Sequence, residues 1–325
     1  MSTATVNTAR AGIFCMLGGM FFISVNDMMV KSLSSDYPLH QLILMRSVTA
    51  IAFTLVLLKI EGGFKLLNTG RWVLHGMRAV FILIANTALY AAISAMPLAM
   101  ATALYFVAPL FVTLLSIPVL GETVGPRRFV AIGLGFAGVL IMMAPQLSAE
   151  GGGLGWVVVL PVIAAAFYAS MSVLTRKLGQ TSRASALALH MQFAFISISA
   201  LVYLVAGDGR FVTEDSNPAM QFLLRAWVWP QTEDLLAIVG LGVMSAIIGY
   251  LMTQAYRLSR ASVVAPFEYV LLIFSLFWGW TIFGEWPMSS VLIGAAVVIA
   301  SGVYVFVREG QVKDARPPEK DAAHL

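Results

Sequence analysis

Four charged side chains lie inside apolar stretches of this 325-residue chain: two acids, Asp27 and Glu268, and two bases, Arg46 and Arg78. A charge within hydrocarbon costs about 3 kcal/mol or more unless it is paired or hydrated, so each one needs a reason. The sequence leaves two interpretations open. The four charges either form static salt bridges between helices, or line a cavity and bind a charged solute or a proton.

Glu268 is the strongest functional candidate of the four. It follows Pro266, which interrupts a helix near its middle, where freed backbone groups usually face a cavity. A carboxylate desolvated at such a break could exchange a proton near neutral pH. We therefore expect Glu268 to take part in substrate binding or in proton coupling.

The two arginines suit an anionic group, because a guanidinium fork matches the shape of a carboxylate or a phosphate. Arg46 and Arg78 each lie close enough to the end of their stretch that snorkelling toward the interface is the alternative. Asp27 follows Asn26 and precedes Lys31 by one helical turn. It either pairs with Lys31 or serves as a gating or substrate residue.

The other polar candidates are His190, as an interhelical hydrogen-bonding residue or a proton relay, and the residues that flank two proline breaks. Aromatic residues could also form a ring-binding pocket, and they are Tyr90, Tyr105, Phe106, Tyr168, Tyr250, Tyr269 and Trp278. Most of them are expected to pack. Only Tyr105 and Tyr269 are chosen as site residues, because they flank the helices that contain Pro109 and Pro266.

The sequence carries none of the common catalytic or metal-binding signatures. It has no His-Glu-x-x-His motif, no Gly-x-Ser-x-Gly elbow and no Walker motif, and Cys15 is its single cysteine. We expect no metal, no cofactor, no ATP hydrolysis and no enzymatic activity. An intramembrane enzyme is kept as a distant alternative.

The elements that must position these residues are membrane helices. The chain is 59% hydrophobic and only 11% charged, its mean hydropathy is +0.87, and a soluble domain is about a quarter charged. Stretches of roughly 20 apolar residues can each cross ~30 Å of hydrocarbon. We predict ten such spans, at residues 11–31, 39–59, 72–94, 98–119, 128–145, 155–176, 184–206, 235–256, 261–283 and 288–307.

Lysine and arginine are unevenly divided between the two sides that these spans define. Fifteen fall on one side and three on the other, which predicts that both termini lie in the cytoplasm of a bacterial inner-membrane protein. No basic patch is interleaved with aromatic residues, so nucleic acid is not an expected partner. The expected partners are the lipid bilayer and a small-molecule substrate, with protons and a homodimer left open.

An internal repeat connects the two halves of the chain. At an offset of 163 residues, Gly121-Glu122 matches Gly284-Glu285, and Ala92, Val107 and Phe111 match Ala255, Val270 and Phe274. A weaker match at an offset of 146 joins Phe21, Ser24 and Lys31 to Phe167, Ser170 and Lys177. Five helices in each half would invert the second half relative to the first, which is an arrangement that supports alternating access.

The predicted organisation follows from these spans and the repeat. It consists of a cytoplasmic N-terminus (1–10), a first repeat (11–145), a second repeat (155–308) with an outer loop (207–234), and a disordered cytoplasmic tail (309–325). Residues 219–229 are expected to form a short helix in the outer interface, as an anchor or a lid. A face of Gly133, Gly135 and Gly138 predicts close helix packing.

The chain resembles the ten-helix EamA/RhaT-like carriers of the drug/metabolite transporter superfamily over roughly residues 11 to 308. The motifs that carry the resemblance are Asn26-Asp27-x-x-x-Lys31, Ala101-Thr-Ala-x-x-x-x-Ala-Pro109, Ala261-Ser-Val-Val-Ala-Pro-Phe-Glu-Tyr269 and the two Gly-Glu pairs. The resemblance implies an all-α fold of two inverted five-helix repeats. It also implies secondary transport of a small metabolite, a class that ranges from amino acids to S-adenosylmethionine, riboflavin and sugars.

The residues and the resemblance together predict a secondary carrier that works by alternating access. Because acids and arginines are both available inside, an amino-acid-like, zwitterionic or anionic metabolite is the favoured cargo, and proton coupling is a hypothesis. The alternative cargo is a vitamin or nucleoside-like solute such as riboflavin or S-adenosylmethionine. A receptor or scaffold is disfavoured by the short loops and tail.

Overall fold

The computed structural model describes residues 3–67, 72–121, 126–147, 155–178, 184–213, 216–258 and 265–314. Every regular element within these ranges is helical. The first half contains α1 (Thr3–Leu33), α2 (Leu39–Glu61), η1 (Phe64–Leu67), α3 (Trp72–Ala95), α4 (Leu98–Tyr105), α5 (Ala108–Leu120) and α6 (Pro126–Leu147). The second half contains η2 (Gly155–Val159), α7 (Leu160–Leu178), α8 (Ala184–Ala206), α9 (Pro218–Leu224), α10 (Leu235–Leu258), η3 (Ala265–Tyr269), α12 (Val270–Phe283) and α13 (Ser289–Asp314).

Seven of the described helical stretches are long and apolar enough to cross a membrane. Three shorter apolar helices, Phe129–Pro145, Phe267–Phe283 and Ser289–Tyr304, coincide with the other three predicted spans. The prediction of an all-α membrane protein is confirmed. The count of ten spans rests on these three shorter helices, because residues 122–125 and 259–264 at their ends lie outside the described ranges.

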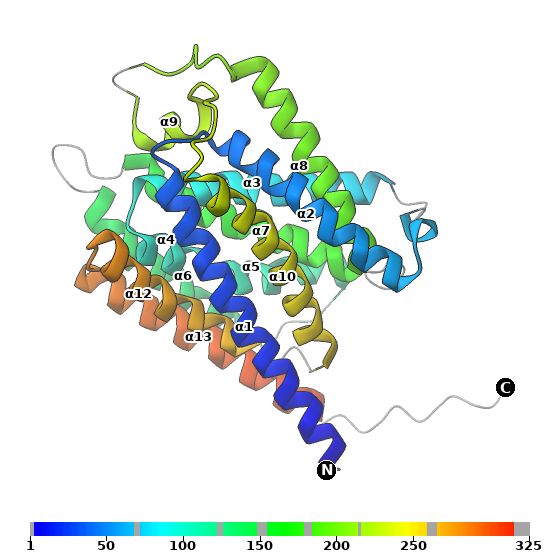
Figure 1. Cartoon of the computed structure of the whole chain (residues 1–325). Coiled ribbons are helices and arrows are strands. Elements are labelled where there is room, and N and C mark those ends of the chain that lie inside the picture. Colours follow the sequence, from blue (N-terminus) through cyan, green and yellow to red (C-terminus); the bar gives the residue numbers. More distant parts are fainter. Residues whose placement is uncertain are drawn as a thin grey trace.

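The two halves are interleaved rather than side by side. Helix α1 crosses the front of the bundle, from the N-terminus to the end that carries α9 (Figure 1), and packs on α10 and α12 of the second half. Helix α3 packs on α7, α2 on α8, and α6 on α13. Every one of these pairings joins an element of the first half to one of the second, so the helices that pack together at the centre come from both halves.

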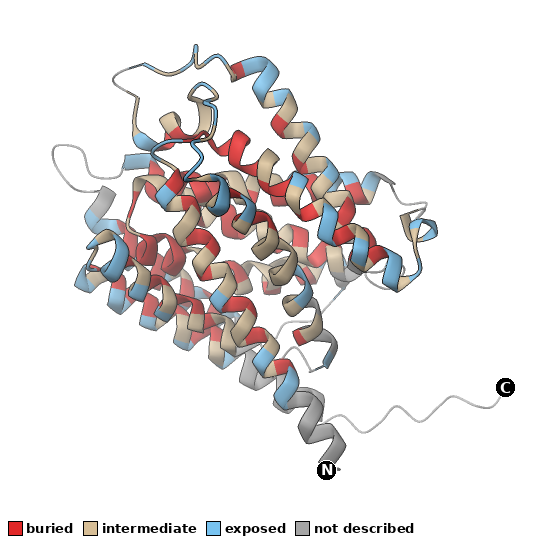
Figure 2. Cartoon of the chain, in the orientation of Figure 1, coloured by how far each residue is buried: buried red, intermediate tan, exposed pale blue. Residues whose placement is uncertain are grey.

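Burial is concentrated at the centre of this bundle. Buried residues cluster where α1 and α4 face their neighbours, while the peripheral helices carry exposed and half-buried residues (Figure 2). Many exposed side chains are large and apolar, among them Phe14, Leu204, Leu236 and Trp280. Such a surface suits lipid rather than water as the surrounding solvent.

The fourth and ninth predicted spans are both interrupted at matching places. Helix α4 ends at Tyr105 and α5 begins at Ala108, and η3 gives way to α12 after Tyr269. The two helices also end alike, because Gly121 and Gly284 both adopt the left-handed conformation, with φ of +71° and +64°. Glycine takes this conformation at little cost, so a shared helix end accounts for the repeated Gly-Glu pair.

The outer loop differs from the expected interfacial helix. Helix α9 covers only Pro218–Leu224, begins at an Asn217 side-chain cap, and buries Ala219 and Phe222 completely against the protein. Trp227 lies beyond the helix and stacks on His40 with ring centroids 5.9 Å apart. Phe222 and Trp227 thus attach this segment to the protein, whereas Trp229 is 93% exposed.

A second contact fixes the same loop near the connection between α1 and α2. The Tyr37 hydroxyl donates a 2.6 Å hydrogen bond to the Asp234 carboxylate and accepts one from the backbone N–H of Gln231. Burial, together with the hydrogen bond to Asp234, raises the pKa of the Tyr37 phenol. The phenol therefore stays neutral and keeps its donor role throughout the physiological range.

The glycine face of α6 yields a prediction about packing against α13. A Cβ built on Gly138 would lie 2.8 Å from the carbonyl oxygen of Gly294, whereas one built on Gly133 would meet nothing within 4 Å. Gly138→Ala should therefore destabilise the protein by roughly 1–3 kcal/mol through overpacking, and Gly133→Ala should be neutral or slightly stabilising. Thermal unfolding of the two variants in the same detergent tests this. Equal melting temperatures would contradict it.

Candidate functional site

A buried tyrosine hydroxyl lies at the centre of the polar groups in the bundle. The Tyr90 hydroxyl on α3 accepts hydrogen bonds from Asn26 Nδ2 on α1 and from Arg46 Nη1 on α2, both at 3.1 Å. All three residues are buried, and the Arg46 guanidinium also lies 5.9 Å from the ring centroid of Phe195. One phenol thus holds three helices in register, and it positions an arginine that the sequence suggested as an anion ligand.

Asp27 belongs to the same group. It is 6% exposed, and it interacts electrostatically with Arg46 and with Tyr90. The Lys31 pairing that was one of its two predicted roles is not formed, because the Lys31 ammonium instead contacts Glu285 at 2.5 Å. The acid and the base of the first half therefore act on each other electrostatically between α1 and α2.

The second half contributes a carboxylate among phenols. Glu268 on η3 interacts electrostatically with Tyr105, Tyr168 and Tyr269. The rings of Tyr105 and Tyr168 are 5.6 Å apart, and Tyr269 meets Phe106 edge to face at 5.1 Å. Aromatic pairs at these separations offer faces and edges on which a planar ring could stack.

Tyr105 joins the two sets into one. Besides Glu268, it interacts electrostatically with Asp27 and Tyr90. We call the combined set the central cluster, and its members are Asn26, Asp27, Arg46, Tyr90, Tyr105, Tyr168, Glu268 and Tyr269. Its charged and aromatic groups come from α1, α2, α3 and α4 of one half and from α7 and η3 of the other.

The space beside the central cluster is small. A crevice bounded by Arg46 and Tyr90, and otherwise by aliphatic side chains of α1, α2 and α10, has an empty volume of about 180 Å³ and is too narrow for water. Small-molecule sites usually occupy about 300 Å³ or more. Binding of a metabolite next to Arg46 would therefore require the surrounding helices to move apart.

Two predicted site residues lie elsewhere, among α3, α7 and α8. Arg78 donates from Nε to Thr175 Oγ1 at 2.7 Å, and the His190 ring stacks on His75 with centroids 5.0 Å apart. His190 Nδ1 also lies 2.7 Å from the Ala186 carbonyl oxygen. Arg78 and His190 thus both adjoin His75, in a group of side chains from α3, α7 and α8.

The remaining predicted residues lie at the helix breaks, and the residues that the sequence analysis did not select are aromatic. Pro109 lies in the first turn of α5, and Pro266 lies within η3. Tyr90 and Tyr168 were recognised as aromatic but were not selected, because position along a helix does not reveal which ring meets a charge. Among the described residues, no three His, Cys, Asp or Glu side chains lie together as potential metal ligands.

The hydrogen bonds of Tyr90 yield a prediction about stability. Tyr90→Phe removes the acceptor for two buried donors, so it should cost roughly 1–3 kcal/mol of unfolding free energy. Tyr304→Phe is the matched control, because that side chain is 46% exposed. In thermal unfolding, the wild type and Tyr304→Phe should have equal melting temperatures, and Tyr90→Phe should have a clearly lower one. A Tyr90→Phe midpoint equal to that of the control would mean that the phenol does not hold the cluster.

Comparison with known proteins finds relatives of this chain that are named as transporters. Residues 10–144 match the EamA-like transporter family. A Vibrio cholerae protein named as a riboflavin transporter is 27% identical over 94% of this chain and 95% of its own. A Rickettsia prowazekii S-adenosylmethionine uptake transporter is 24% identical, with coverage of 94% and 95%.

Two further matches extend these findings. A Pseudomonas aeruginosa protein named as the pseudopaline exporter CntI is 24% identical over 90% of this chain and 94% of its own. One solved crystal structure shares the fold, with a TM-score of 0.62, 18% identity and coverage of 95% and 99%. Residues 10–144 thus match the EamA-like transporter family, and the chain is similar over nearly its whole length to bacterial proteins named as small-molecule transporters.

Proposed function

We propose that this protein carries a small metabolite with a planar heteroaromatic ring, of the riboflavin or S-adenosylmethionine kind, through the central cluster by alternating access. The observation that carries the proposal is the composition of that cluster. A half-buried aromatic pair, Tyr105–Tyr168, and a buried one, Phe106–Tyr269, lie beside the Glu268 carboxylate. Tyr105 connects that carboxylate to the polar group around Arg46. Rings can stack on the aromatics while polar substituents bind the charges.

The site also suits alternating access, because both halves build it. Arg46 and Tyr90 belong to the first half, and Glu268 and Tyr168 to the second. A movement of one half relative to the other would therefore widen or close the space between these groups, which is how a site at a repeat interface opens to each side in turn. The small volume beside Arg46 fits a closed arrangement in such a cycle.

The relatives support the heteroaromatic cargo, which was the alternative cargo on sequence grounds. Proteins that align along nearly the whole chain are named for riboflavin and for S-adenosylmethionine, and both compounds contain a planar heteroaromatic ring system. One relative is named as an exporter, so the direction of transport is left open in the proposal. The bacterial inner membrane and cytoplasmic termini belong to the same proposal, on the basis of the lysine and arginine distribution.

A second candidate cargo is the amino-acid-like, zwitterionic or anionic metabolite that the charges suggested. Arg46 favours it, because its guanidinium is buried at the centre and already donates to a neutral oxygen, that of Tyr90. A carboxylate could replace that hydroxyl as a stronger acceptor. S-adenosylmethionine would satisfy both candidates, since it carries an adenine ring and an amino-acid end.

Ligand-induced stabilisation of the purified protein distinguishes the two cargo classes. Riboflavin, S-adenosylmethionine, adenosine, glutamate and citrate would each be added at increasing concentration during thermal unfolding. A ligand at 100 times its dissociation constant adds about 2.7 kcal/mol of stability, which shifts the melting temperature measurably. We expect riboflavin or S-adenosylmethionine to stabilise the protein, and glutamate and citrate to have no effect.

Two variants of one residue test the stacking itself. Tyr168→Phe keeps the ring, so it should retain the affinity for the stabilising ligand within about threefold, whereas Tyr168→Leu should lose roughly tenfold, since stacking is worth about 1–3 kcal/mol per ring. Equal losses in the two variants would contradict ring stacking. If only citrate or glutamate stabilises the protein, and Arg46→Ala abolishes that effect, the cargo belongs to the second class and the heteroaromatic proposal is wrong.

Proton coupling is proposed for Glu268 and is tested separately. In proteoliposomes, Glu268→Gln should abolish uptake that is driven by a pH gradient while leaving exchange of labelled for unlabelled substrate measurable, because the amide cannot carry a proton. Glu233→Gln, in an exposed position of the outer loop, is the control. If Glu268→Gln leaves the transport rate and its pH dependence unchanged, Glu268 is not the coupling residue.

A further inference from the structure

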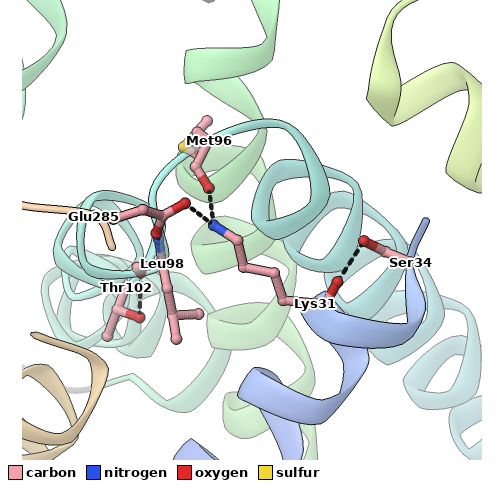
Figure 3. Close-up of polar contacts among 6 residues, drawn as sticks. All are labelled: Lys31, Ser34, Met96, Leu98, Thr102 and Glu285. Carbon is pink, nitrogen blue, oxygen red and sulfur yellow. Dashed lines mark hydrogen bonds and ion pairs between the residues drawn. The ribbon is translucent and has the colours of Figure 1, made fainter. Parts of the chain in front are cut away.

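One ion pair joins the two halves at the end of the bundle that carries α9. The Lys31 ammonium, near the end of α1, lies 2.5 Å from Glu285 Oε1 and donates to the Met96 carbonyl oxygen at 2.9 Å (Figure 3). Glu285 Oε2 accepts from the backbone N–H of Leu98 at 3.0 Å. We call this set of contacts the latch, and its members are Lys31, Met96, Leu98 and Glu285.

The latch holds three chain segments together. It fixes the end of α1 and the start of α4, both from the first half, to Glu285, the second residue after the end of α12 in the second half. Its side chains are largely shielded, since Lys31 is 11% and Glu285 25% exposed. Shielded, hydrogen-bonded ion pairs are screened little by salt, and loss of one partner leaves the other charge poorly solvated.

The position of Glu285 depends on the glycine before it. Gly284 ends α12 with φ of +64°, and the Glu285 N–H then bonds back to the Gly279 carbonyl oxygen at 2.8 Å. A residue with a Cβ would disfavour this turn. The sequence repeat matches Glu285 with Glu122 and Lys31 with Lys177, and Glu122 lies outside the described residues.

Two more contacts follow below the latch, along the same helices. Thr102 Oγ1 on α4 lies 3.0 Å from Ser275 Oγ on α12. The indole N–H of Trp278, also on α12, donates to Ser24 Oγ on α1 at 3.1 Å. Further along, α4 ends at Tyr105, a member of the central cluster. The latch and these two contacts thus form a row that joins α12 to α1 and α4.

We propose that Lys31 and Glu285 form the gate at this end of the transporter, and that breaking their ion pair is the step that lets α12 separate from α1 and α4. The inference rests on transport by alternating access, as proposed above. The gate is a contact between halves and not part of the binding site, because its two charges bind each other and nearby backbone groups. An ion pair with a purely structural role would make the same contacts, but breaking it would not change the fraction of molecules that are open at this end.

The test measures that population directly, without any cargo. In a Cys15→Ala background, spin labels at Ser32→Cys and Trp286→Cys flank the latch, and both positions are exposed. Pulsed electron–electron double resonance then gives the distance distribution between α1 and the segment after α12. With the latch intact we expect one predominant short distance.

Breaking the latch should lengthen that distance in a large fraction of molecules. Glu285→Gln keeps the shape and an acceptor for the Leu98 N–H but removes the charge, and Lys31→Met removes the other partner. Each should raise the ratio of long to short distances about tenfold or more, because an unpaired shielded charge favours the open arrangement. Lys31→Arg, which keeps the ion pair, should resemble the wild type.

Asp208→Asn is the matched control, because it neutralises one partner of the exposed Arg210–Asp208 pair in the outer loop. Unchanged distributions in both Glu285→Gln and Lys31→Met, in samples that still unfold cooperatively, would overturn the proposal and make the pair a static staple. A shift equal to that of Asp208→Asn would do the same. Because no ligand is present, a wrong cargo assignment cannot produce either result.

Discussion

The low dielectric of the bilayer makes an unpartnered charge costly, and the rest of this structure depends on the contacts that partner its buried charges. Tyr90 is the partner of Asn26 and Arg46, and Glu285 is the partner of Lys31. Each of these contacts crosses between helices that are distant along the chain. Polar groups that would be expensive alone therefore act as the connections that give the helices one defined arrangement.

The two connections differ in what they join, and this difference is functionally important. The bonds of Tyr90 lie within the first half, so they can persist while the halves move. The Lys31–Glu285 contact crosses from the first half to the second, so it must change whenever the halves separate at that end. A carrier needs both kinds of contact. Some preserve the geometry of the site, and others hold a particular conformation closed until it is released.

The small crevice beside Arg46 is consistent with this division. Its aliphatic walls come from α1, α2 and α10, and its polar border is Arg46 with Tyr90. In the closed arrangement the site is filled by its own side chains. Arg46 then needs no water, because Tyr90 accepts its hydrogen bond and Asp27 interacts with it electrostatically. The substrate would then replace internal partners with its own polar groups as the helices open.

Composition and periodicity determined the membrane class, the approximate bounds of the helices and the correspondence of the two Gly-Glu ends, because these depend on short-range chemistry. The left-handed φ of Gly121 and Gly284 gives that correspondence its physical reason. The partner of each charged side chain could not be determined in this way. From spacing alone, Lys31 was matched to Asp27, one helical turn before it, and Arg78 was a candidate anion ligand alongside Arg46.

Only the tertiary structure showed which partners these side chains contact. It placed Lys31 against Glu285, at a sequence separation of 254 residues, and it placed Arg78 beside Thr175 and the histidine stack. The reason is that interhelical contacts depend on the rotation and tilt of each helix, which are set by packing against neighbours from the other half. A sequence pattern reports which face of a helix is polar, and packing decides what that face meets.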